Sequence, residues 1–183
     1  MKFKQVQHTL KDGRKVKIRE ATLKDAEELR NVIKEYVERS EFIPYAEGEF
    51  NLSIEEEEQW IQSFIDIPNG LLLIADIEGK IVGNLSLNAN KREMLQHTAI
   101  IGIGMLKEYR GLGLGSIFFQ ETINWAKNYS SLEFLSLETY ATNKAGIALY
   151  KKFGFKQAGL LSGFVKVSPN EYIDSITMVL DIR

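Results

Sequence analysis

The chain contains 183 residues, of which 44% are hydrophobic and 26% charged, and its formal net charge is only −2. This length and composition predict a soluble, single globular domain over residues 1–183 that can bury roughly 70% of its unfolded surface without a metal or disulfide. So small a net charge argues against nucleic acid as a partner, because binding to phosphates normally calls for a clustered basic face.

Cysteine is absent, which excludes disulfides, thiolate metal sites and a covalent thioester on the protein, and which fits a cytoplasmic location. His8 and His97 lie far apart without the spacing of a metal site, so no metal is expected. The N-terminus lacks the apolar segment of a signal peptide, and the longest apolar runs span only a handful of residues. We therefore expect the protein neither to span a membrane nor to be addressed to one.

The chain begins with a predicted hairpin, whose strands over residues 3–10 and 14–21 flank the turn dipeptide Asp12-Gly13. A helix over residues 23–39 follows, because apolar residues recur there at steps of three and four. These apolar residues are Leu23, Ala26, Leu29, Ile33 and Val37.

A second helix is predicted over residues 54–66. It begins with Ser53-Ile54-Glu55-Glu56, a capping box in which serine and glutamate satisfy backbone N–H groups. The four glutamates 55–58 have two interpretations. They form a solvated first turn whose negative charge interacts favourably with the helix dipole, or they attract a cationic substrate electrostatically.

The remaining elements change from a meander to an alternation of helices and strands. Strands are predicted over Leu71–Asp76 and Lys80–Asn88, around the turn Glu78-Gly79, and over Ala99–Leu106. This order predicts an α/β fold in which helices cover a mixed sheet. The later elements are a helix over 114–129, a strand over 133–140, a helix over 144–153, and strands near 155–166 and 172–181.

Two glycines share one face of the strand 99–106. Glycine weakens a strand and leaves no side chain to pack, so Gly102 and Gly104 suggest that another group lies against the backbone. We expect this group to be a flat arm of a ligand.

A glycine-rich loop follows that strand and opens the helix 114–129. Glycines at positions 111, 113 and 115 let successive N–H groups turn toward one point, and the helix terminus adds partial positive charge. Arg110 adds a full charge, so the segment predicts a site for a pyrophosphate. The alternative is a glycine-rich turn that serves only to reverse the chain.

Other phosphate loops fit this segment less well. A P-loop requires Lys-Ser or Lys-Thr after its last glycine, but Gly115 is followed by Ser116-Ile117. The dinucleotide-binding pattern requires glycine where Ser116 stands, although Glu138 is about where its ribose-binding acid would be.

A second signal begins 28 residues after Gly115. The segment Asn143–Phe155 predicts a short helix stopped by Gly154, with Asn143 and Tyr150 seven residues apart and so on one face. Taken alone, Asn143 is an N-cap and Tyr150 a half-buried core aromatic.

Together these two segments resemble the GCN5-related N-acetyltransferase (GNAT) superfamily. The run Arg110-x-x-Gly113-x-Gly115 is similar to that family's acetyl-CoA pyrophosphate loop, and residues 143–155 are similar to its "N…A…LY.K.GF" signature. One departure is Gly146, where the family usually has alanine. The segment Tyr172–Met178 also resembles the ribosomal-protein-acetyltransferase-like branch.

The resemblance implies a mostly antiparallel sheet with helices on both faces. Its fourth and fifth strands, here near 99–106 and 133–140, would splay apart to admit pantetheine. It further implies acetyl-CoA as cosubstrate and an amine of a small molecule or protein as acceptor. The implied cofactor-binding residues are Ile103, Met105, Arg110, Gly111, Leu112, Gly113, Leu114, Gly115, Ser116 and Asn143.

Because the chain has no cysteine, the simplest route is direct attack of the amine on the thioester in a ternary complex. Tyr150 is the candidate acid, since a phenol with a pKa of about 10 is protonated at neutral pH and can give its proton to the departing thiolate. The base stays open among His97, Glu41, Glu49 and Glu138.

Two other functions remain possible from the sequence: a noncatalytic acyl-CoA-binding module and a nucleotide-dependent oxidoreductase. The identity of the acceptor cannot be predicted, but the aromatic and acidic segment 41–50 is the first place to look for an amine site. An exposed late strand could also pair two copies into a homodimer.

Overall fold

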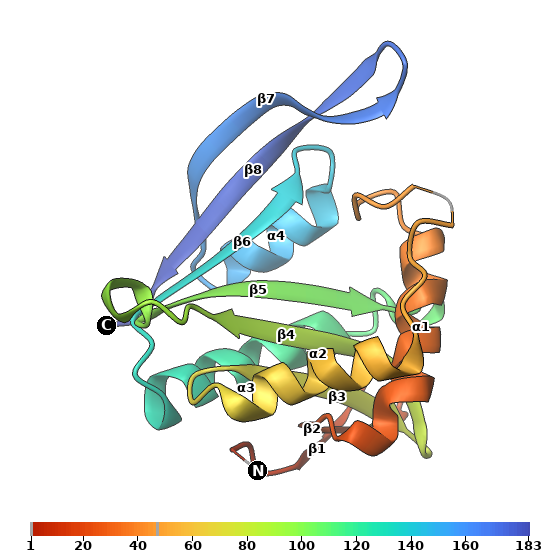
Figure 1. The fold of residues 1–183 in the computed structure, drawn as a ribbon, viewed down its shortest axis with the longest axis vertical. Helices are drawn as coiled ribbons and strands as arrows, with labels where there is room; N and C mark the ends of the chain where they lie inside the picture. The colour runs from red at the N-terminus through yellow and green to blue at the C-terminus, as the bar shows by residue number, and fades with distance from the viewer. Residues whose placement is uncertain (1, 47) are drawn as a thin grey trace.

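The computed structural model describes residues 2–46 and 48–183. One mixed sheet runs through the molecule with strand order β1-β2-β3-β4-β5-β6-β8-β7, and every neighbouring pair is antiparallel except β5–β6 (Figure 1). The strands are β1 (Val6–Thr9), β2 (Lys15–Glu20), β3 (Leu71–Ile77), β4 (Lys80–Ala89), β5 (Thr98–Met105), β6 (Phe134–Tyr140), β7 (Lys156–Ser168) and β8 (Glu171–Asp181). The predicted mixed, mostly antiparallel sheet is therefore confirmed, and it does not provide the parallel sheet that an oxidoreductase would need.

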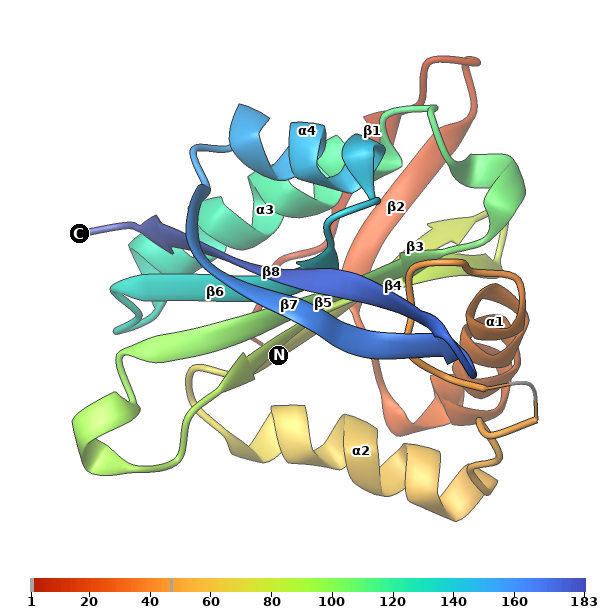
Figure 2. The same ribbon diagram turned by 90° about the horizontal axis from the view of Figure 1, so that it is seen from above.

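Helices cover both faces of the sheet, as Figure 2 shows from above. Two helices lie on one face and pack on each other and on β3 through a core that includes Leu29, Ile61 and Ile74. The other two lie on the opposite face over a second core built around Phe118 and Phe119. The first pair is α1 (Ala26–Glu38) and α2 (Ile54–Asp66), and the second pair is α3 (Leu114–Tyr129) and α4 (Lys144–Lys152).

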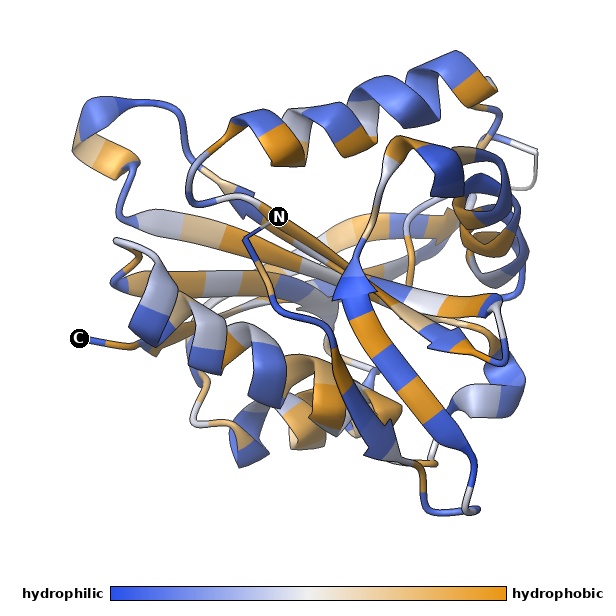
Figure 3. Ribbon diagram, turned by 90° about the horizontal axis from the view of Figure 1, so that it is seen from below, coloured by the Kyte–Doolittle hydropathy of each residue, from blue (hydrophilic) through white to orange (hydrophobic). Residues whose placement is uncertain are grey.

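The hydropathy pattern explains this layering. Figure 3 shows mostly hydrophobic strands at the centre of the sheet, whereas α2 alternates between hydrophilic and hydrophobic turns. All seven residues of β3 are buried, as expected for a strand covered on both faces. Among the described residues, none of the helices is both long and apolar enough to cross a membrane.

One residue of the apolar stripe predicted for the helix 23–39 is exposed. Leu23 belongs to a short 3-10 helix (Leu23–Asp25) ahead of α1 and is 41% exposed. The apolar periodicity continues into this turn, although α1 itself begins only at Ala26. Two further 3-10 turns, Glu93–Leu95 and Lys107–Tyr109, were not predicted.

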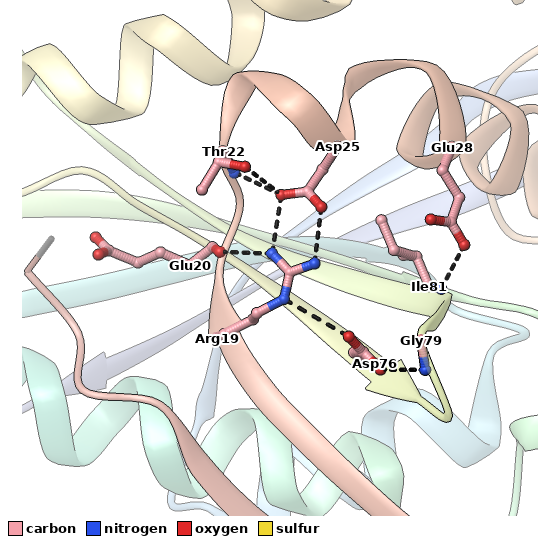
Figure 4. Close-up of polar contacts among 8 residues, drawn as sticks. All are labelled: Arg19, Glu20, Thr22, Asp25, Glu28, Asp76, Gly79 and Ile81. Atoms are coloured by element: carbon pink, nitrogen blue, oxygen red, sulfur yellow. Dashed lines mark hydrogen bonds and ion pairs between the residues drawn. The ribbon is translucent and has the colours of Figure 1, made fainter.

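A buried ionic network fixes the start of α1 (Figure 4). The Arg19 guanidinium donates to both carboxylate oxygens of Asp25 at 2.8 and 2.7 Å, and its Nε lies 3.7 Å from Asp76 on β3. Burial opposes ionisation of Asp25, but hydrogen bonds from Arg19 and Thr22 outweigh it and lower the pKa of that carboxyl. The network anchors α1 against β2 and β3, and so sets the position of Tyr36 farther along the helix.

Candidate active site

The glycine-rich loop passes from the 3-10 turn Lys107–Tyr109 into α3. Gly111 and Gly113 have φ values of 76° and 95°, in the left-handed region that favours glycine. With these two glycines in the left-handed conformation, the loop leads directly into α3, and Gly113 is the N-cap residue of this helix.

The N–H groups of this loop are free to bind a ligand. Those of residues 111–116 donate to no acceptor among residues 2–46 and 48–183. The first N–H groups of a helix lack partners within the helix, and the 16-residue α3 adds partial positive charge at that end. A run of unpaired donors at a helix N-terminus suits a diphosphate, so the residues present fit this part of coenzyme A.

Three cationic side chains surround the same loop. The Arg110 guanidinium donates from Nε and one Nη to the carbonyl of Met105 at 3.4 and 3.3 Å. Lys152 Nζ donates to Ser116 Oγ at 3.2 Å, and Lys11 lines the same cleft and donates its backbone N–H to the carbonyl of Leu112 at 3.0 Å. Neither Lys11 nor Lys152 was predicted from the sequence, because Lys11 comes from a hairpin about 100 residues upstream and Lys152 from the end of α4.

Beside this loop the sheet opens between β5 and β6. The two strands pair only at three positions, ending with Ile100 opposite Ser136, and then diverge (Figure 1). The predicted splay is therefore confirmed. Leu106 N–H donates to Val82 on β4, and since backbone groups alternate in direction along a strand, those of Ile103 and Met105 point into the gap.

A cleft of about 930 Å³ extends from the gap across to α1 and α2. We call its two parts the loop side and the helix side. The loop side is lined by Met105, Arg110, Gly113, Ser116, Asn143 and Tyr150, and the helix side by Tyr36, Tyr45, Phe50, Glu57, Trp60 and Asn84.

Tyr150 lines the loop side although its side chain is only 7% exposed. Its ring packs against Phe119 and Phe155, with centroid distances of 5.4 and 6.4 Å. Burial raises the pKa of the Tyr150 hydroxyl above its ordinary value, and the Thr139 side chain partly offsets this effect. The phenol is therefore neutral, and can donate a proton, throughout the physiological range.

Asn143 caps α4. Its Oδ1 accepts from Gly146 N–H at 3.0 Å, and its Nδ2 donates to Thr139 Oγ1 at 3.0 Å. A Cβ on Gly146 would lie 2.5 Å from Asn143 Nδ2, so the absence of a side chain at this position leaves room for the Asn143 amide. The second N–H of the Asn143 amide is the group that could still reach a ligand.

Of the two glycines on one face of β5, Gly104 is covered by the chain itself, whereas Gly102 is exposed and lines the cleft. A Cβ on Gly104 would lie 2.2 Å from the ring of Tyr36, and one on Gly102 would lie 2.8 Å from Ser86 Oγ. Tyr36 is buried and donates its hydroxyl to Asn84 Oδ1 at 3.0 Å. The expectation that a ligand arm lies on this face is therefore wrong at Gly104, where the absent side chain makes room for Tyr36.

Two members of the expected cofactor set contribute no side chain to the cleft. The Leu114 side chain is 1% exposed and packs in the core beneath α3. Leu112 packs against the same core, and its carbonyl accepts from Lys11. Each of them can offer a ligand only its backbone N–H.

The carboxylates and the histidine considered as bases are dispersed. His97 lies just before β5, at the end where β5 and β6 are paired, about 26 Å along the strand from Met105. Neither His97, Glu41 nor Glu49 lines the cleft, and the Glu49 carboxylate accepts from Ala46 N–H at 2.7 Å. Of the four candidates, only Glu138 on β6 lines it.

The segment 41–50 does reach the cleft. Its residues Phe42, Ile43, Pro44, Tyr45 and Phe50 are among those that line the helix side, and Glu47 lies outside the described residues.

Glu57 on α2 lines the cleft, which was not predicted from the sequence. Its side chain is fully buried, both carboxylate oxygens lack a partner among the described residues, and it lines the cleft. Burial raises the pKa of Glu57 to about 7, partly offset by the charge of Arg30. The prediction of a solvated first turn is therefore correct for Glu55, Glu56 and Glu58 but wrong for Glu57. The available signal was its spacing, because position 57 falls in one helical stripe with Ile54, Ile61 and Phe64.

Comparison with known proteins identifies the class of this molecule. Residues 32–155 match the model of the Acetyltransferase (GNAT) family. The crystal structure of the acetyltransferase of GNAT family from Streptococcus pneumoniae is 30% identical, covers 92% of this chain and 99% of its own, and superposes with a TM-score of 0.87. The chain therefore belongs to the Acetyltransferase (GNAT) family, as the two motifs indicated.

Two further proteins resemble this chain, one in sequence and one in fold. An L-amino acid N-acetyltransferase from Escherichia coli is 27% identical over 122 residues, which are 67% of this chain and 75% of that protein. The structure of a putative acetyltransferase from Salmonella typhimurium with its cofactor acetyl-CoA shares the fold, with a TM-score of 0.80 at 16% identity, and covers 92% of this chain and 94% of its own.

Proposed function

We propose that this protein transfers the acetyl group of acetyl-CoA to a primary amine by direct attack in a ternary complex. The observation that carries the proposal is that the sheet opens between β5 and β6 directly beside the unpaired N–H groups of residues 111–116. Tyr150 lines the same cleft and is available there as an acid.

The loop side would hold the cosubstrate mainly through backbone groups. The N–H groups of residues 111–116 would bind the diphosphate, with Lys11, Arg110 and Lys152 adding charge. The backbone groups of Ile103 and Met105 would hydrogen-bond the pantetheine amides, as an added strand would. The Met105 carbonyl already accepts from Arg110, so this guanidinium has to move, or share the acceptor, when a ligand amide arrives.

When bound, acetyl-CoA supplies an activated acyl carbon and a thiolate leaving group. The amine nitrogen forms the new C–N bond, the C–S bond breaks, and the Tyr150 hydroxyl donates its proton to the departing sulfur. The proton that the nitrogen loses as the amide forms restores the phenol through solvent. The buried, neutral state of Tyr150 suits this role.

A turnover assay with a panel of primary amines, which detects the free thiol of coenzyme A, tests this function. Calorimetric titration with acetyl-CoA and with NAD⁺ measures in addition which of the two the protein binds. We expect acetyl-CoA binding, no NAD⁺ binding, and thiol release that depends on the amine. Acetyl-CoA binding without amine-dependent release from any member of the panel would instead favour the noncatalytic acyl-CoA-binding module.

We further propose that β7 supports a homodimer. It is the last strand of the sheet, so its outer edge has unpaired backbone groups, and it carries the exposed apolar residues Leu160, Leu161 and Phe164. Light scattering after size-exclusion chromatography should give twice the mass of the chain, and Leu161→Lys should restore the single mass. A single mass for the unaltered protein would contradict the dimer.

A further inference from the structure

The helix side of the cleft contains a buried carboxylate without a counter-charge. Glu57 is 0% exposed, and neither of its oxygens has a hydrogen-bond partner among residues 2–46 and 48–183. A buried carboxylate is normally paired with a cation or fully hydrogen-bonded, because leaving it alone is costly. Glu57 lines the cleft, so a ligand in the cleft can supply the missing partner.

The groups packed around Glu57 do not neutralise it. From α1, Tyr36 and Arg30 are the titratable and charged neighbours, and the charge of Glu57 raises the pKa of the Tyr36 hydroxyl further. Arg30 directs its guanidinium elsewhere, donating to the carbonyl of Leu52 at 3.3 Å and to Asn31 Oδ1 at 3.2 Å. From β3, the residues in the core shared with α2 are the apolar Leu72 and Ile74. On α2 itself, the other charged residue that lines the cleft is Glu56.

The walls around this carboxylate are largely aromatic. Phe42, Tyr45 and Phe50, from the segment between α1 and α2, line the helix side together with Trp60 of α2. Tyr45 and Phe50 pack edge to face, with centroids 5.7 Å apart, so these two rings form a continuous apolar surface. Aromatic side chains beside a carboxylate are complementary to a ligand that combines a cationic group with an apolar body.

We infer that Glu57 is a further catalytic residue, which pairs with the ammonium group of an amine that carries an apolar or aromatic body and then accepts one of its protons. This inference rests on the acetyl transfer proposed above and names the class of its acceptor. It places the proton acceptor on α2, away from the histidine and glutamates that the sequence suggested.

The protons balance across the reaction. The ammonium gives one proton to the Glu57 carboxylate and becomes the neutral nucleophile. Its nitrogen forms the C–N bond, the C–S bond breaks, and Tyr150 protonates the sulfur. The second proton that the nitrogen loses restores Tyr150, and Glu57 releases its proton to solvent before the next cycle. The net result is an amide, free coenzyme A thiol and one proton.

Glu57→Gln tests the inference, with Glu58→Gln as a matched control that makes the same charge change on the exposed side of α2. The probe is 2-phenylethylamine, and 2-phenylethanol is its uncharged counterpart. In the protein with coenzyme A bound at pH 8, we expect the amine to bind at least tenfold more tightly than the alcohol. Glu57→Gln should abolish this preference, and Glu58→Gln should keep it.

The pH profile of kcat/KM supplies a readout that a purely structural role would not move. We expect log(kcat/KM) of the unaltered protein to rise with unit slope below about pH 7 and to reach a plateau above it. Glu57→Gln should lower kcat/KM by about 100-fold and flatten this limb, with acetyl-CoA affinity unchanged.

The outcomes separate the two proposals. If the unaltered protein binds no acetyl-CoA, the proposed function itself fails. If acetyl-CoA binds and other amines are acetylated but 2-phenylethylamine is not bound, the acceptor class is wrong. If Glu57→Gln keeps the preference for the amine and the pH limb, Glu57 is not the proton acceptor, and acetyl transfer stands without it.

Discussion

The two sides of the cleft are built in different ways. The loop side presents main-chain N–H groups from one short segment, residues 111–116, together with Tyr150 from a second. The helix side is made of side chains from α1, α2 and the segment between them, arranged around Glu57. Backbone recognition of a constant cosubstrate leaves a contiguous motif in the sequence, whereas side-chain recognition of a particular acceptor does not.

The largest effect expected on the loop side comes from Tyr150→Phe. The variant keeps the ring that packs on Phe119 and Phe155 and removes only the hydroxyl. Loss of a proton donor in the transition state should lower kcat by about 100-fold or more, with acetyl-CoA affinity unchanged. Steady-state kinetics at saturating acetyl-CoA measures this, and an unchanged kcat would remove Tyr150 from the reaction.

The helix side makes a stability prediction that is independent of turnover. The pKa of Glu57 is raised from 4.5 to about 7 in the folded protein, so the folded state favours the protonated form. The native state thus binds more protons between these values, and the protein loses stability as pH rises from about 4.5 through 7. The stability of Glu57→Gln does not fall with pH in this way, because the amide does not ionise. The free energy of unfolding of this variant should therefore exceed that of the unaltered protein by up to about 3 kcal/mol at pH 8, but not at pH 4.5.

Urea denaturation at the two pH values measures this difference. Glu58→Gln, on the exposed side of the same helix, is the control and should show no such pH-dependent gain. Equal stability of Glu57→Gln and the unaltered protein at pH 8 would mean that the Glu57 carboxylate is not confined in a desolvated site.

A smaller effect is expected from Gly113→Ala. A φ of 95° costs a residue with a Cβ about 1–2 kcal/mol of backbone strain. If the backbone of the variant relaxes out of this conformation, the N–H groups of the loop no longer converge on one point. We expect acetyl-CoA binding to weaken about tenfold. Gly79→Ala is the matched control, because Gly79 has a φ of 82° in the β3–β4 turn and does not line the cleft. Equal acetyl-CoA affinities of the two variants would contradict a role for the loop conformation.

The smallest effect concerns the charge around the loop. Lys11→Ala should weaken acetyl-CoA binding by a few-fold at low salt and reduce its salt dependence, since an exposed cation contributes a modest, screened attraction. Lys24→Ala, on the 3-10 turn before α1, should leave both quantities unchanged. Calorimetry at two salt concentrations distinguishes the variants, and identical salt slopes would exclude Lys11 from the diphosphate site.

Much of the fold could be predicted because its signals are local. The bounds of α2 and α3 agree with prediction, since Ser53 and Glu56 form the expected capping box and Gly113 marks the start of α3. The exposed Leu23 was wrongly placed in the buried stripe, because periodicity alone does not show that α1 begins only at Ala26.

The site was predictable only in part, for a related reason. Gly111 and Gly113 have the conformational freedom that a loop of converging N–H groups requires, and this can be inferred from residue type. Whether Glu57 faces solvent or the cleft depends on how α2 packs on α1, which is a tertiary property. Likewise, the sequence could not show that Tyr36 fills the space over Gly104.

A crystal structure of the protein with acetyl-CoA is the most direct test of this account. We predict that the diphosphate accepts hydrogen bonds from the N–H groups of residues 111–116, and that the thioester sulfur lies within hydrogen-bonding distance of the Tyr150 hydroxyl. A diphosphate bound elsewhere, or a sulfur out of reach of Tyr150, would contradict the account.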